Sequence, residues 1–417
     1  MNTESALSPA PVEDATLTLD DVRAAATRIE GAVVRTPTLH SQTLSDMTGA
    51  NIWLKFENQQ FTAAYKERGA LNTLLQMAPE QLERGVIAAS AGNHAQGLAY
   101  HGKRLGVPVT IVMPRTTPTV KVYQTQSHGA EIVLHGENFD ESVGKARELE
   151  RERGLTFVPP FDDPRIAAGQ GTVALEMLED APEIDTLIIP IGGGGLFAGM
   201  GTAARGIKSD IALYGVQAEL YPSMYAHLHH VDMPAEGDTL AEGIAVKQPG
   251  AFTAKVVSQL ADDIVLVGER HLERAVSLLL QIEKTVAEGG GAAGLAALLA
   301  HGDRFQGRNI GLTLSGGNID TRLLANVLLR DLARSGRLAR LRIRLQDRPG
   351  ALFKVMRAFD EHQFNIIEIY HQRVFTTLPA KGLITDIECE TRDREHLNRL
   401  IATLRNDGYQ VTLVELA

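Results

Sequence analysis

The sequence contains a single cysteine, Cys389, among 417 residues. A disulfide within the chain is therefore impossible, and a metal site built from thiolates is disfavoured. No apolar run approaches the roughly 18 residues that a membrane-spanning helix requires. Residues 1–15 also lack the charged and then apolar order of a signal peptide. We therefore expect a disordered leader over residues 1–17 and a cytoplasmic protein.

An excess of basic residues is likewise absent. The chain has 41 Lys and Arg against 51 Asp and Glu, which gives a formal net charge of −10. This balance favours solubility and gives no sign of a nucleic-acid or membrane surface. The 39 glycines follow no collagen-like or low-complexity period, so we expect them at turns.

From Thr18 to about residue 320, short apolar runs alternate with longer amphipathic stretches. Thr18 and Asp21 have the spacing of a capping box at the start of the first helix. Buried parallel strands are expected at residues 85–90, 109–113, 131–134, 186–191, 212–216, 263–267 and 310–314. This alternation predicts an α/β domain with open, mostly parallel sheets over residues 18–330.

The pattern changes near residue 331, where Ser335 and Gly336 indicate a linker over residues 331–338. Residues 339–417 then predict a second domain. Its elements are expected as strand 338–346, helix 350–361, strand 364–373, strand 382–390, helix 394–406 and strand 410–415. The order βαββαβ is typical of the ferredoxin-like fold.

Lys66 stands among small and aromatic residues, in the stretch Thr-Ala-Ala-Tyr-Lys-Glu-Arg-Gly-Ala of residues 62–70. Most lysines are solvated surface charges. An amine among such neighbours instead loses solvation, which lowers its pKa and makes it a nucleophile. Lys66 is therefore a candidate catalytic residue.

Three further motifs follow the ends of predicted strands. Residues 90–94 read Ser-Ala-Gly-Asn-His before a helix, which favours either a cradle for a carboxylate or a simple capping turn. Residues 190–196 contain four consecutive glycines, whose N–H groups can approach a phosphate closely. The third motif, Leu-Ser-Gly-Gly-Asn at residues 314–318, includes Ser315. A lysine and a glycine-rich phosphate loop at one sheet edge indicate pyridoxal phosphate.

In these motifs the sequence resembles the threonine ammonia-lyases (threonine dehydratases), within the tryptophan-synthase-β-like (fold type II) class of pyridoxal-phosphate enzymes. The resemblance covers about residues 18–320. It also includes Arg-Thr-Pro-Thr at 35–38, Phe-Asp-Asp-Pro at 161–164, Gly-Gln-Gly-Thr at 169–172 and Ala-Glu-Gly-Ile-Ala-Val at 241–246. It implies a β-elimination that converts L-threonine into 2-oxobutanoate and ammonia, with L-serine as a further substrate.

The resemblance implies a role for each motif. Lys66 forms the Schiff base with the cofactor, and its freed amine removes the substrate Cα proton. Asn93 contacts the 3′-oxygen of the cofactor, and Ser315, as a neutral partner of the pyridine nitrogen, favours prompt loss of the hydroxyl. The cofactor phosphate, which assists that loss, is bound by Gly192, Gly193, Gly194, Gly195 and Leu196. The substrate carboxylate is bound by Ser90, Ala91, Gly92, Asn93 and His94.

The residues before the lysine depart from this family. Ala63, Ala64 and Tyr65 stand where the family usually reads Gly-Ser-Phe. Related serine racemases use a serine at position 64 as a second base, so racemisation is disfavoured here. The loss of that hydroxyl leaves the preference among hydroxy-amino acids open.

Four further positions bear on the site. The acidic metal ligands of the racemases would fall near Gln217, Tyr221 and Ser223, so we predict no divalent metal of that type. Glu288, where the family often has Glu-Pro, either approaches the substrate or has a structural role.

The C-terminal domain resembles an ACT domain, through Asp-Arg-Pro-Gly-Ala-Leu at 347–352 and Phe-Asn-Ile-Ile-Glu at 364–368. Such modules usually pair edge to edge and bind an amino acid between subunits. The resemblance therefore implies a homo-oligomer (dimer or tetramer) and an amino-acid effector, isoleucine being one hypothesis. A purely structural dimerisation module is the alternative. The effector candidates are Asp347, Arg348, Pro349, Gly350 and Asn365.

Three other functions compete with this interpretation. A serine or 3-hydroxyaspartate ammonia-lyase would use the same scaffold. A non-catalytic amino-acid sensor would explain the altered residues before Lys66, but a sensor need not retain all four motifs. A nicotinamide dehydrogenase is weaker still, because the dinucleotide fingerprint is missing.

Overall fold

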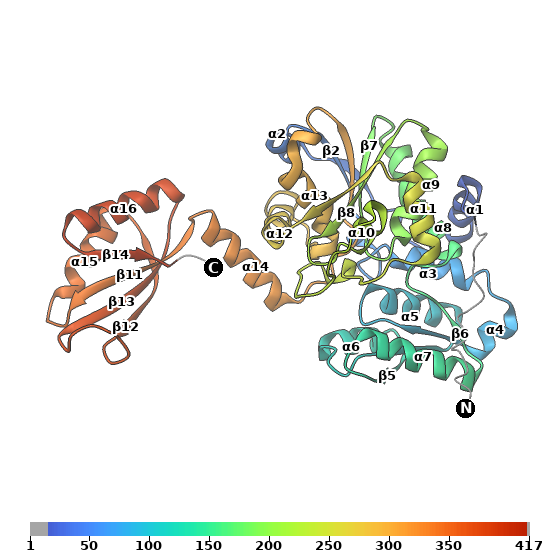
Figure 1. Cartoon of the computed structure of the whole chain (residues 1–417), viewed down its shortest axis with the longest axis horizontal. Coiled ribbons are helices and arrows are strands. Elements are labelled where there is room, and N and C mark those ends of the chain that lie inside the picture. The colour runs from blue at the N-terminus through green and yellow to red at the C-terminus, as the bar shows by residue number, and fades with distance from the viewer. Residues whose placement is uncertain (1–15, 415–417) are drawn as a thin grey trace. The chain divides into compact units, whose positions relative to one another are not determined.

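A computed structural model describes residues 16–414. Contacts within the chain define two compact units, the first ending at Ile319 and the second beginning at Asp320 (Figure 1). Residues 1–15 of the expected leader and residue 415 of the last expected strand lie outside the described residues. Within residues 16–414, no helix has the length and apolar character needed to cross a bilayer.

The first unit contains two sheets. The larger has the strand order β1-β2-β10-β7-β8-β9, and the smaller has the order β5-β4-β3-β6. The larger sheet consists of β1 (Thr38–His40), β2 (Asn51–Lys55), β7 (Thr186–Pro190), β8 (Ala212–Ala218), β9 (Asp263–Val267) and β10 (Asn309–Thr313). The smaller consists of β3 (Val86–Ala89), β4 (Val109–Met113), β5 (Glu131–Leu134) and β6 (Thr156–Phe157). All neighbours pair in parallel except β1 and β2, which confirms the predicted α/β class.

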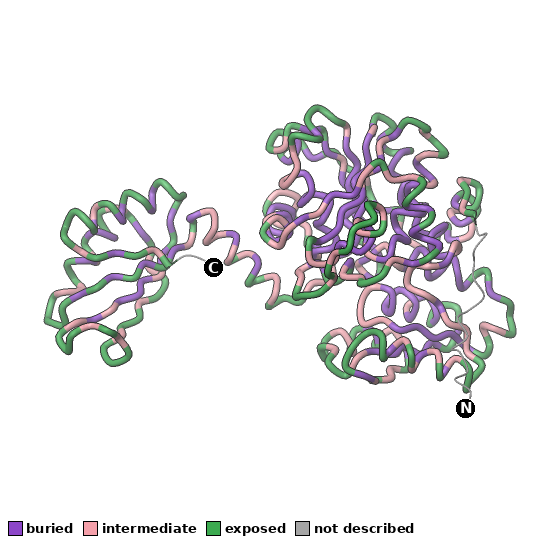
Figure 2. Tube along the Cα trace, in the orientation of Figure 1, coloured by how far each residue is buried: buried purple, intermediate pink, exposed green. Residues whose placement is uncertain are grey.

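Helices pack against these sheets and complete the core (Figure 1). The α-helices of the first unit are α1 (Leu19–Ile29), α2 (Gln42–Thr48), α3 (Lys66–Leu74), α4 (Pro79–Arg84), α5 (Asn93–Leu105), α6 (Thr119–Ser127), α7 (Phe139–Arg153), α8 (Pro164–Asp180), α9 (Gly195–Ile207), α10 (Ser223–His229), α11 (Ala251–Leu260), α12 (Glu269–Glu283) and α13 (Gly289–His301). Its short 3-10 helices are η1 (Glu57–Gln59), η2 (Glu242–Ile244) and η3 (Gly302–Arg304). The capping box expected at α1 is confirmed, because Thr18 Oγ1 accepts from Asp21 N and the Asp21 carboxylate accepts from Thr18 N. Figure 2 shows buried residues along the strands and inner helices of this unit.

The second unit is an antiparallel sheet with two helices packed against it, preceded by α14 (Thr321–Arg334). Its other elements are β11 (Leu338–Gln346), α15 (Ala351–Glu361), β12 (Asn365–Gln372), β13 (Gly382–Glu390), α16 (Arg394–Asn406) and β14 (Gln410–Leu413). The strand order β12-β13-β11-β14 is that of the predicted ferredoxin-like fold. Along β11 the apolar residues are buried and the arginines between them are exposed. Helix α14 covers part of the stretch where a linker is expected at residues 331–338.

Three strands of the first unit end next to the predicted motifs. β3 leads into α5 through residues 90–92, and β7 leads into α9 through the glycine loop, residues 191–194. β10 is followed by Ser315. Because both sheets are parallel at these strands, the carboxyl ends present the motifs to one another, as open α/β sheets do at ligand sites.

Candidate active site

Lys66 is the first residue of α3, and its ammonium group is surrounded by protein. Its Nζ donates to the carbonyl oxygen of Pro160 at 2.8 Å and lies 5.4 Å from the centre of the Tyr65 ring. Burial lowers the pKa of Lys66 to about 8, although the nearby Glu288 opposes this shift. A lysine with this pKa has an appreciable neutral, nucleophilic fraction near neutral pH.

The residues before Lys66 pair with the third strand-end motif. Ala64 forms an isolated antiparallel bridge with Gly316, and Tyr65 N donates to Ser315 O at 3.1 Å. Ala63 has φ +54°, in the left-handed region that suits the glycine usual at this position in the resembling family. The structure therefore brings the lysine segment and the Ser315 motif side by side.

The motif at residues 90–94 occupies the turn between β3 and α5. Asn93 is the first residue of α5, and Gly92 N donates to Ser90 Oγ at 3.3 Å. His94 Nε2 donates to Val158 O at 3.0 Å, and burial, with the charge of Lys66, lowers the pKa of His94 to about 3. The imidazole is thus neutral and engaged elsewhere, so His94 can serve an anion at this turn only through its backbone N–H.

The glycine loop precedes α9, a helix of 13 residues. A Cβ placed on Gly193 would lie 2.3 Å from the Phe161 ring, and Gly194 has φ +96°. Thr253 Oγ1 donates to Gly193 O at 2.5 Å and so fixes the loop from a neighbouring helix. The N–H groups at the start of α9 and the positive end of its dipole suit a phosphate.

The Phe-Asp-Asp-Pro motif connects these parts. Pro160, the residue before the motif, accepts from Lys66, and the ring of Phe161 lies against the glycine loop. The Asp162 carboxylate accepts from Ala251 N and Thr253 N, at 3.0 and 3.1 Å, at the start of α11. In the sequence this motif stands out only through the family resemblance, and the structure shows what its residues contact.

Ser315 and Glu288 lie at the start of α13. Ser315 is buried, and its hydroxyl donates to Gly290 O at 3.4 Å. Glu288 is the N-cap residue of α13, and its Oε1 accepts from Asn93 Nδ2 at 2.7 Å. Burial raises the pKa of Glu288 to about 7. A carboxyl group therefore stands between the Asn93 and Ser315 motifs.

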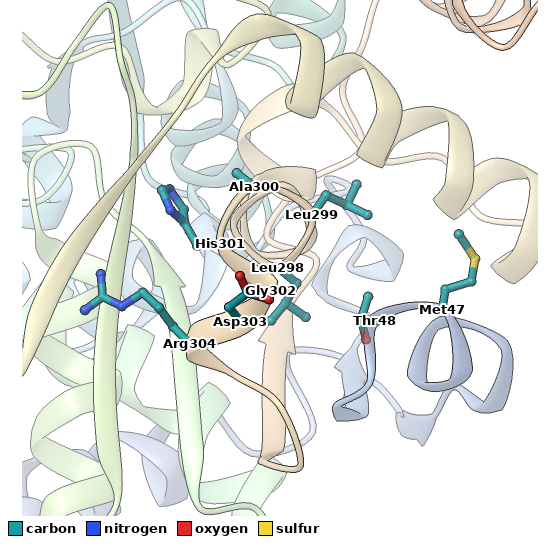
Figure 3. A pocket seen from close by; sticks show the side chains of 9 residues that line it. All are labelled: Met47, Thr48, Leu298, Leu299, Ala300, His301, Gly302, Asp303 and Arg304. Carbon is teal, nitrogen blue, oxygen red and sulfur yellow. The ribbon is translucent and has the colours of Figure 1, made fainter.

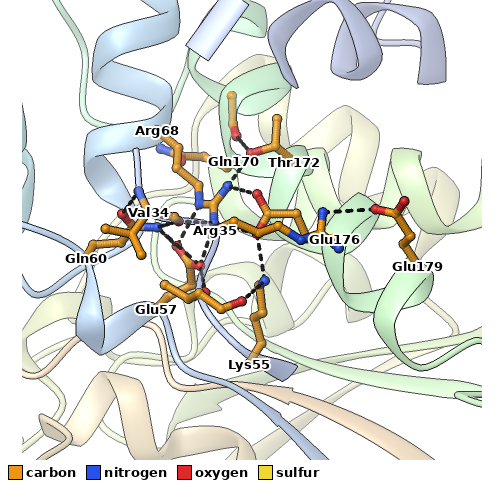
Figure 4. Close-up of polar contacts among 12 residues, drawn as sticks. Val34, Arg35, Lys55, Glu57, Gln60, Arg68, Gln170, Thr172, Glu176 and Glu179 are labelled. Atoms are coloured by element: carbon orange, nitrogen blue, oxygen red, sulfur yellow. Dashed lines mark hydrogen bonds and ion pairs between the residues drawn. The ribbon is translucent and has the colours of Figure 1, made fainter. Parts of the chain in front are cut away.

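A buried ion network supports the helix that begins at Lys66 (Figure 4). Arg68 donates to both oxygens of Glu57 at 2.8 Å, and to both oxygens of Glu176 at 2.7 and 2.8 Å. Lys55 Nζ donates to Glu176 at 2.6 Å. Burial alone would raise the pKa of Glu57, but Arg68 and Lys55 hold it below its ordinary value. The sequence does not predict this network, because its members share no motif and single charged residues resemble surface residues.

The positions compared with the racemase metal ligands are occupied by hydrogen-bonded side chains. Gln217 Oε1 accepts from Tyr225 N at 2.8 Å, Tyr221 donates to Gly237 O at 2.9 Å, and Ser223 donates to Val246 O at 2.7 Å. Within residues 16–414, no three His, Cys, Asp or Glu side chains are arranged to hold a metal ion.

Figure 3 shows the residues that line one surface hollow. It measures about 540 Å³ and is lined by Met47, Thr48 and residues 298–304. These residues include the carboxyl end of α13, whereas Glu288 stands at the amino end of the same helix. None of the predicted site residues lines the hollow.

The effector candidates lie at the turn into α15 and at the start of β12. Gly350 has φ +79° and is the N-cap residue of α15. Asp347 accepts from Arg373 Nε at 3.0 Å, and Asn365 Nδ2 donates to Glu390 at 2.8 Å. Asp347 and Asn365 thus have their side chains engaged within the unit.

The residues of the first unit fit pyridoxal phosphate. A lysine amine of lowered pKa, a glycine loop at a helix N-terminus and a buried neutral hydroxyl are the groups that this cofactor needs for attachment, phosphate binding and its ring nitrogen. The Cβ contact at Gly193 shows that the loop accommodates no side chain.

Comparison with known proteins assigns the family. The chain matches the family model "Pyridoxal-phosphate dependent enzyme" over residues 29–316 and the ACT domain model over residues 339–406. It is 43% identical over 392 residues to an L-threonine ammonia-lyase of Geobacter sulfurreducens, covering 93% of this chain and 97% of that protein. It is 39% identical over 400 residues to the L-threonine ammonia-lyase of Thermotoga maritima, covering 95% and 100%.

A solved structure agrees with these matches. The processed form of threonine deaminase isoform 2 from Solanum lycopersicum superposes with a TM-score of 0.69 at 35% identity, covering 74% of this chain and 92% of that one. The chain therefore belongs to the threonine ammonia-lyase family of pyridoxal-phosphate dependent enzymes and carries a C-terminal ACT domain.

Proposed function

We propose that the protein eliminates the β-hydroxyl of L-threonine and releases 2-oxobutanoate and ammonia, and that it also accepts L-serine. The observation that carries this proposal is the lysine of lowered pKa, Lys66, beside a glycine phosphate loop and the neutral Ser315. The relatives named L-threonine ammonia-lyase support the choice of substrate.

Each residue group has a task in this reaction. When bound, pyridoxal phosphate supplies an electron sink for the substrate Cα. Lys66 holds the cofactor covalently and, once freed, takes the Cα proton. The loop from Gly192 to Leu196 binds the phosphate, and the start of α5, from Ser90 to His94, binds the substrate carboxylate.

Ala64 supports elimination over racemisation. Its side chain is fully buried beside the lysine segment and has no ionisable group. A racemase needs a second base on the face of the cofactor opposite the lysine, and Ala64 cannot provide one. We infer that a proton removed by Lys66 is not returned from the other face.

The effector of the ACT domain and the oligomeric state are also proposals. We infer that the ACT domain binds an amino acid at the turn that includes Asp347, Arg348, Pro349 and Gly350, with Asn365 nearby in the sheet, and that the chain forms a homo-oligomer. Isothermal calorimetry with the branched-chain amino acids tests the effector, and light scattering tests the oligomer. The cytoplasmic location favoured by the sequence stays a prediction.

The central experiment measures cofactor attachment and keto-acid release together. The purified enzyme should show a visible absorbance band, and borohydride should fix the cofactor to Lys66 in the peptide map. L-threonine should yield 2-oxobutanoate, and Lys66→Ala should release none, whereas Lys103→Ala on the surface of α5 should match wild type. A band fixed to Lys66 without keto-acid release from threonine, serine or 3-hydroxyaspartate would overturn the proposed reaction.

A further inference from the structure

The side-chain amide of Asn93 has partners at both of its ends. Its Oδ1 accepts from Asn318 Nδ2 at 2.8 Å, and its Nδ2 donates to Glu288 Oε1 at 2.7 Å. These partners come from the motif after β10 and from the start of α13. The orientation of the amide is therefore controlled by residues far away in the sequence.

The direction of these hydrogen bonds is fixed at a backbone carbonyl. Asn318 Nδ2 also donates to Thr62 O at 2.8 Å, and a carbonyl oxygen can only accept. The end of the Asn318 side chain that faces both Thr62 and Asn93 must then be its NH₂ group. It follows that Asn93 presents Oδ1 to Asn318 and its NH₂ group to Glu288.

Packing reinforces this arrangement. A Cβ placed on Gly316 would lie 2.5 Å from Glu288 Oε1 and 2.9 Å from Asn93 Nδ2. The backbone of Asn318 also faces the Glu288 carboxyl group and acts to lower the pKa of that group, against the effect of burial. Glu288 thus has contacts on several sides and little freedom to release Asn93.

One N–H of the Asn93 amide is left for a ligand. An amide NH₂ group has two hydrogens, and one points to Glu288. Within residues 16–414, no other side chain accepts from Asn93 Nδ2. An N–H donor suits the electron-rich ring oxygen of pyridoxal phosphate, whereas the opposite amide orientation would present a repelling oxygen.

We propose that Asn318 and Glu288 are positioning residues, which fix the Asn93 amide so that its remaining N–H faces the ring oxygen of the cofactor. This inference rests on the proposed placement of Asn93 beside that oxygen. It assigns a task to Glu288 and to the last residue of the Leu-Ser-Gly-Gly-Asn motif.

The test uses purified full-length protein and pyridoxal phosphate. Asn318→Asp replaces the donor to Thr62 O and Asn93 by a carboxylate. The apoenzyme should bind pyridoxal phosphate on the order of tenfold more weakly, and the visible band of the bound cofactor should shift. At a pH well above the pKa of Lys66, where its amine is neutral in both proteins, Glu288→Gln keeps an oxygen acceptor and should stay near wild type in both readouts, whereas Glu288→Ala should resemble Asn318→Asp.

A matched control exists in the same region. Asn58 Nδ2 also donates to two oxygens, Thr285 Oγ1 at 2.7 Å and Val286 O at 2.8 Å, but it does not contact Asn93. Asn58→Asp should lower thermal stability without shifting the visible band. Equal band shifts in the control and in Asn318→Asp would overturn the proposal, because they would indicate general destabilisation.

Asn93→Asp separates this inference from the proposed role of Asn93. An altered band in Asn93→Asp with an unaltered one in Asn318→Asp and Glu288→Ala would reject the positioning residues alone. An unaltered band in Asn93→Asp would reject the contact with the ring oxygen and the inference with it. If Asn318→Asp does not fold, Gly316→Ala provides the same comparison, since its methyl group would displace both Glu288 and Asn93.

Discussion

Each unit of the chain contains an arginine–carboxylate pair of the same geometry, but the two arginines differ in exposure. In the catalytic unit, Arg68 and Glu57 form an ion pair in which both side chains are 0% exposed. In the ACT domain, Arg342 pairs with Asp386 across two strands, and the arginine side chain is 44% exposed although that of Asp386 is 5% exposed. Both pairs are bidentate with distances of 2.8 Å, so their geometry does not distinguish them. The two pairs differ in how far their surroundings exclude water from the arginine.

This difference indicates what each pair contributes to the free energy of unfolding. A buried pair gains little over apolar residues, but loss of one partner leaves a buried charge, which is strongly destabilising. A half-exposed arginine such as Arg342 keeps part of its hydration, so its pairing contributes less to stability. The catalytic unit therefore depends on its buried pair for the position of α3 and Lys66. The ACT domain depends mainly on its apolar core.

The largest effect is expected for Arg68→Met. This change leaves Glu57 buried without its main cation and should lower the free energy of unfolding by about 3 to 5 kcal/mol. Trp53 is the single tryptophan of the chain and lies in β2, so urea unfolding followed by its fluorescence reports on the catalytic unit. Arg342→Met is the control and should change the Trp53 transition little.

A second variant tests the stated cause. Glu57→Gln added to Arg68→Met removes the unpaired carboxylate, so the double variant should be more stable than Arg68→Met alone. If the double variant is the less stable of the two, the burial of an unpaired charge is not the reason for the loss.

The next effect concerns the amine of Lys66, which the burial of the site keeps partly neutral. With a pKa of about 8, the amine is protonated below that pH and neutral above it. The rate at which apoenzyme captures pyridoxal phosphate should therefore rise up to about pH 8 and then level off. Glu288 is negative when ionised and raises the pKa of Lys66, so Glu288→Gln should move the midpoint to lower pH.

The titration of pyridoxal phosphate itself affects wild type and variant equally, so it does not change the difference between their midpoints. His94 also faces Lys66, but it stays neutral through this range because its pKa is about 3. A midpoint that rises in Glu288→Gln, or one near 10.5 in wild type, would contradict the assigned electrostatics.

The features of the structure that could be predicted are those that leave a local pattern in the sequence. Most of the parallel strands and the βαββαβ order follow from apolar periodicity and the positions of turns. Strands β1, β2 and β6 were missed: β1 and β6 have only three and two residues, and the apolar run of β2 is only three residues long. The strand expected at residues 131–134 is present as β5, but it is an edge strand and is not buried as predicted. The site motifs could be found because a run of four glycines, or a lysine among small residues, is rare in a turn or helix that serves only the fold.

Long-range polar partners could not be predicted. Asn318 was part of a recognised motif, yet its bonds to Thr62 and Asn93 join residues 256 and 225 positions away. Glu176 pairs with Arg68 across 108 positions. Sequence periodicity reports which face of an element is buried, but not which two charged residues meet inside the core.

A smaller effect is expected at Ala63, whose φ of +54° is unfavourable for a residue with a Cβ. Ala63→Gly should stabilise the catalytic unit by about 0.5 to 1 kcal/mol, because relief of the left-handed strain exceeds the added chain entropy. Ala64→Gly is the matched control: Ala64 has no positive φ and is fully buried, so the change should destabilise. Urea unfolding followed by Trp53 fluorescence measures the free energy of unfolding of both variants. If both changes in this free energy have the same sign, the proposed strain at Ala63 is contradicted.

The smallest effect is expected for the exposed pair Arg340 and Glu388 of the ACT domain, where the arginine side chain is 49% exposed. A double-mutant cycle with Arg340→Met and Glu388→Gln should give a coupling of about 0.2 to 1 kcal/mol that shrinks as salt rises. Cys389 is the single cysteine and is buried in the ACT core, so its rate of thiol labelling in urea reports on this unit alone. The coupling between Arg68 and Glu57, followed by Trp53, should respond far less to salt because both charges are buried. Couplings that are equal in size and equally sensitive to salt would show that burial does not distinguish the two units.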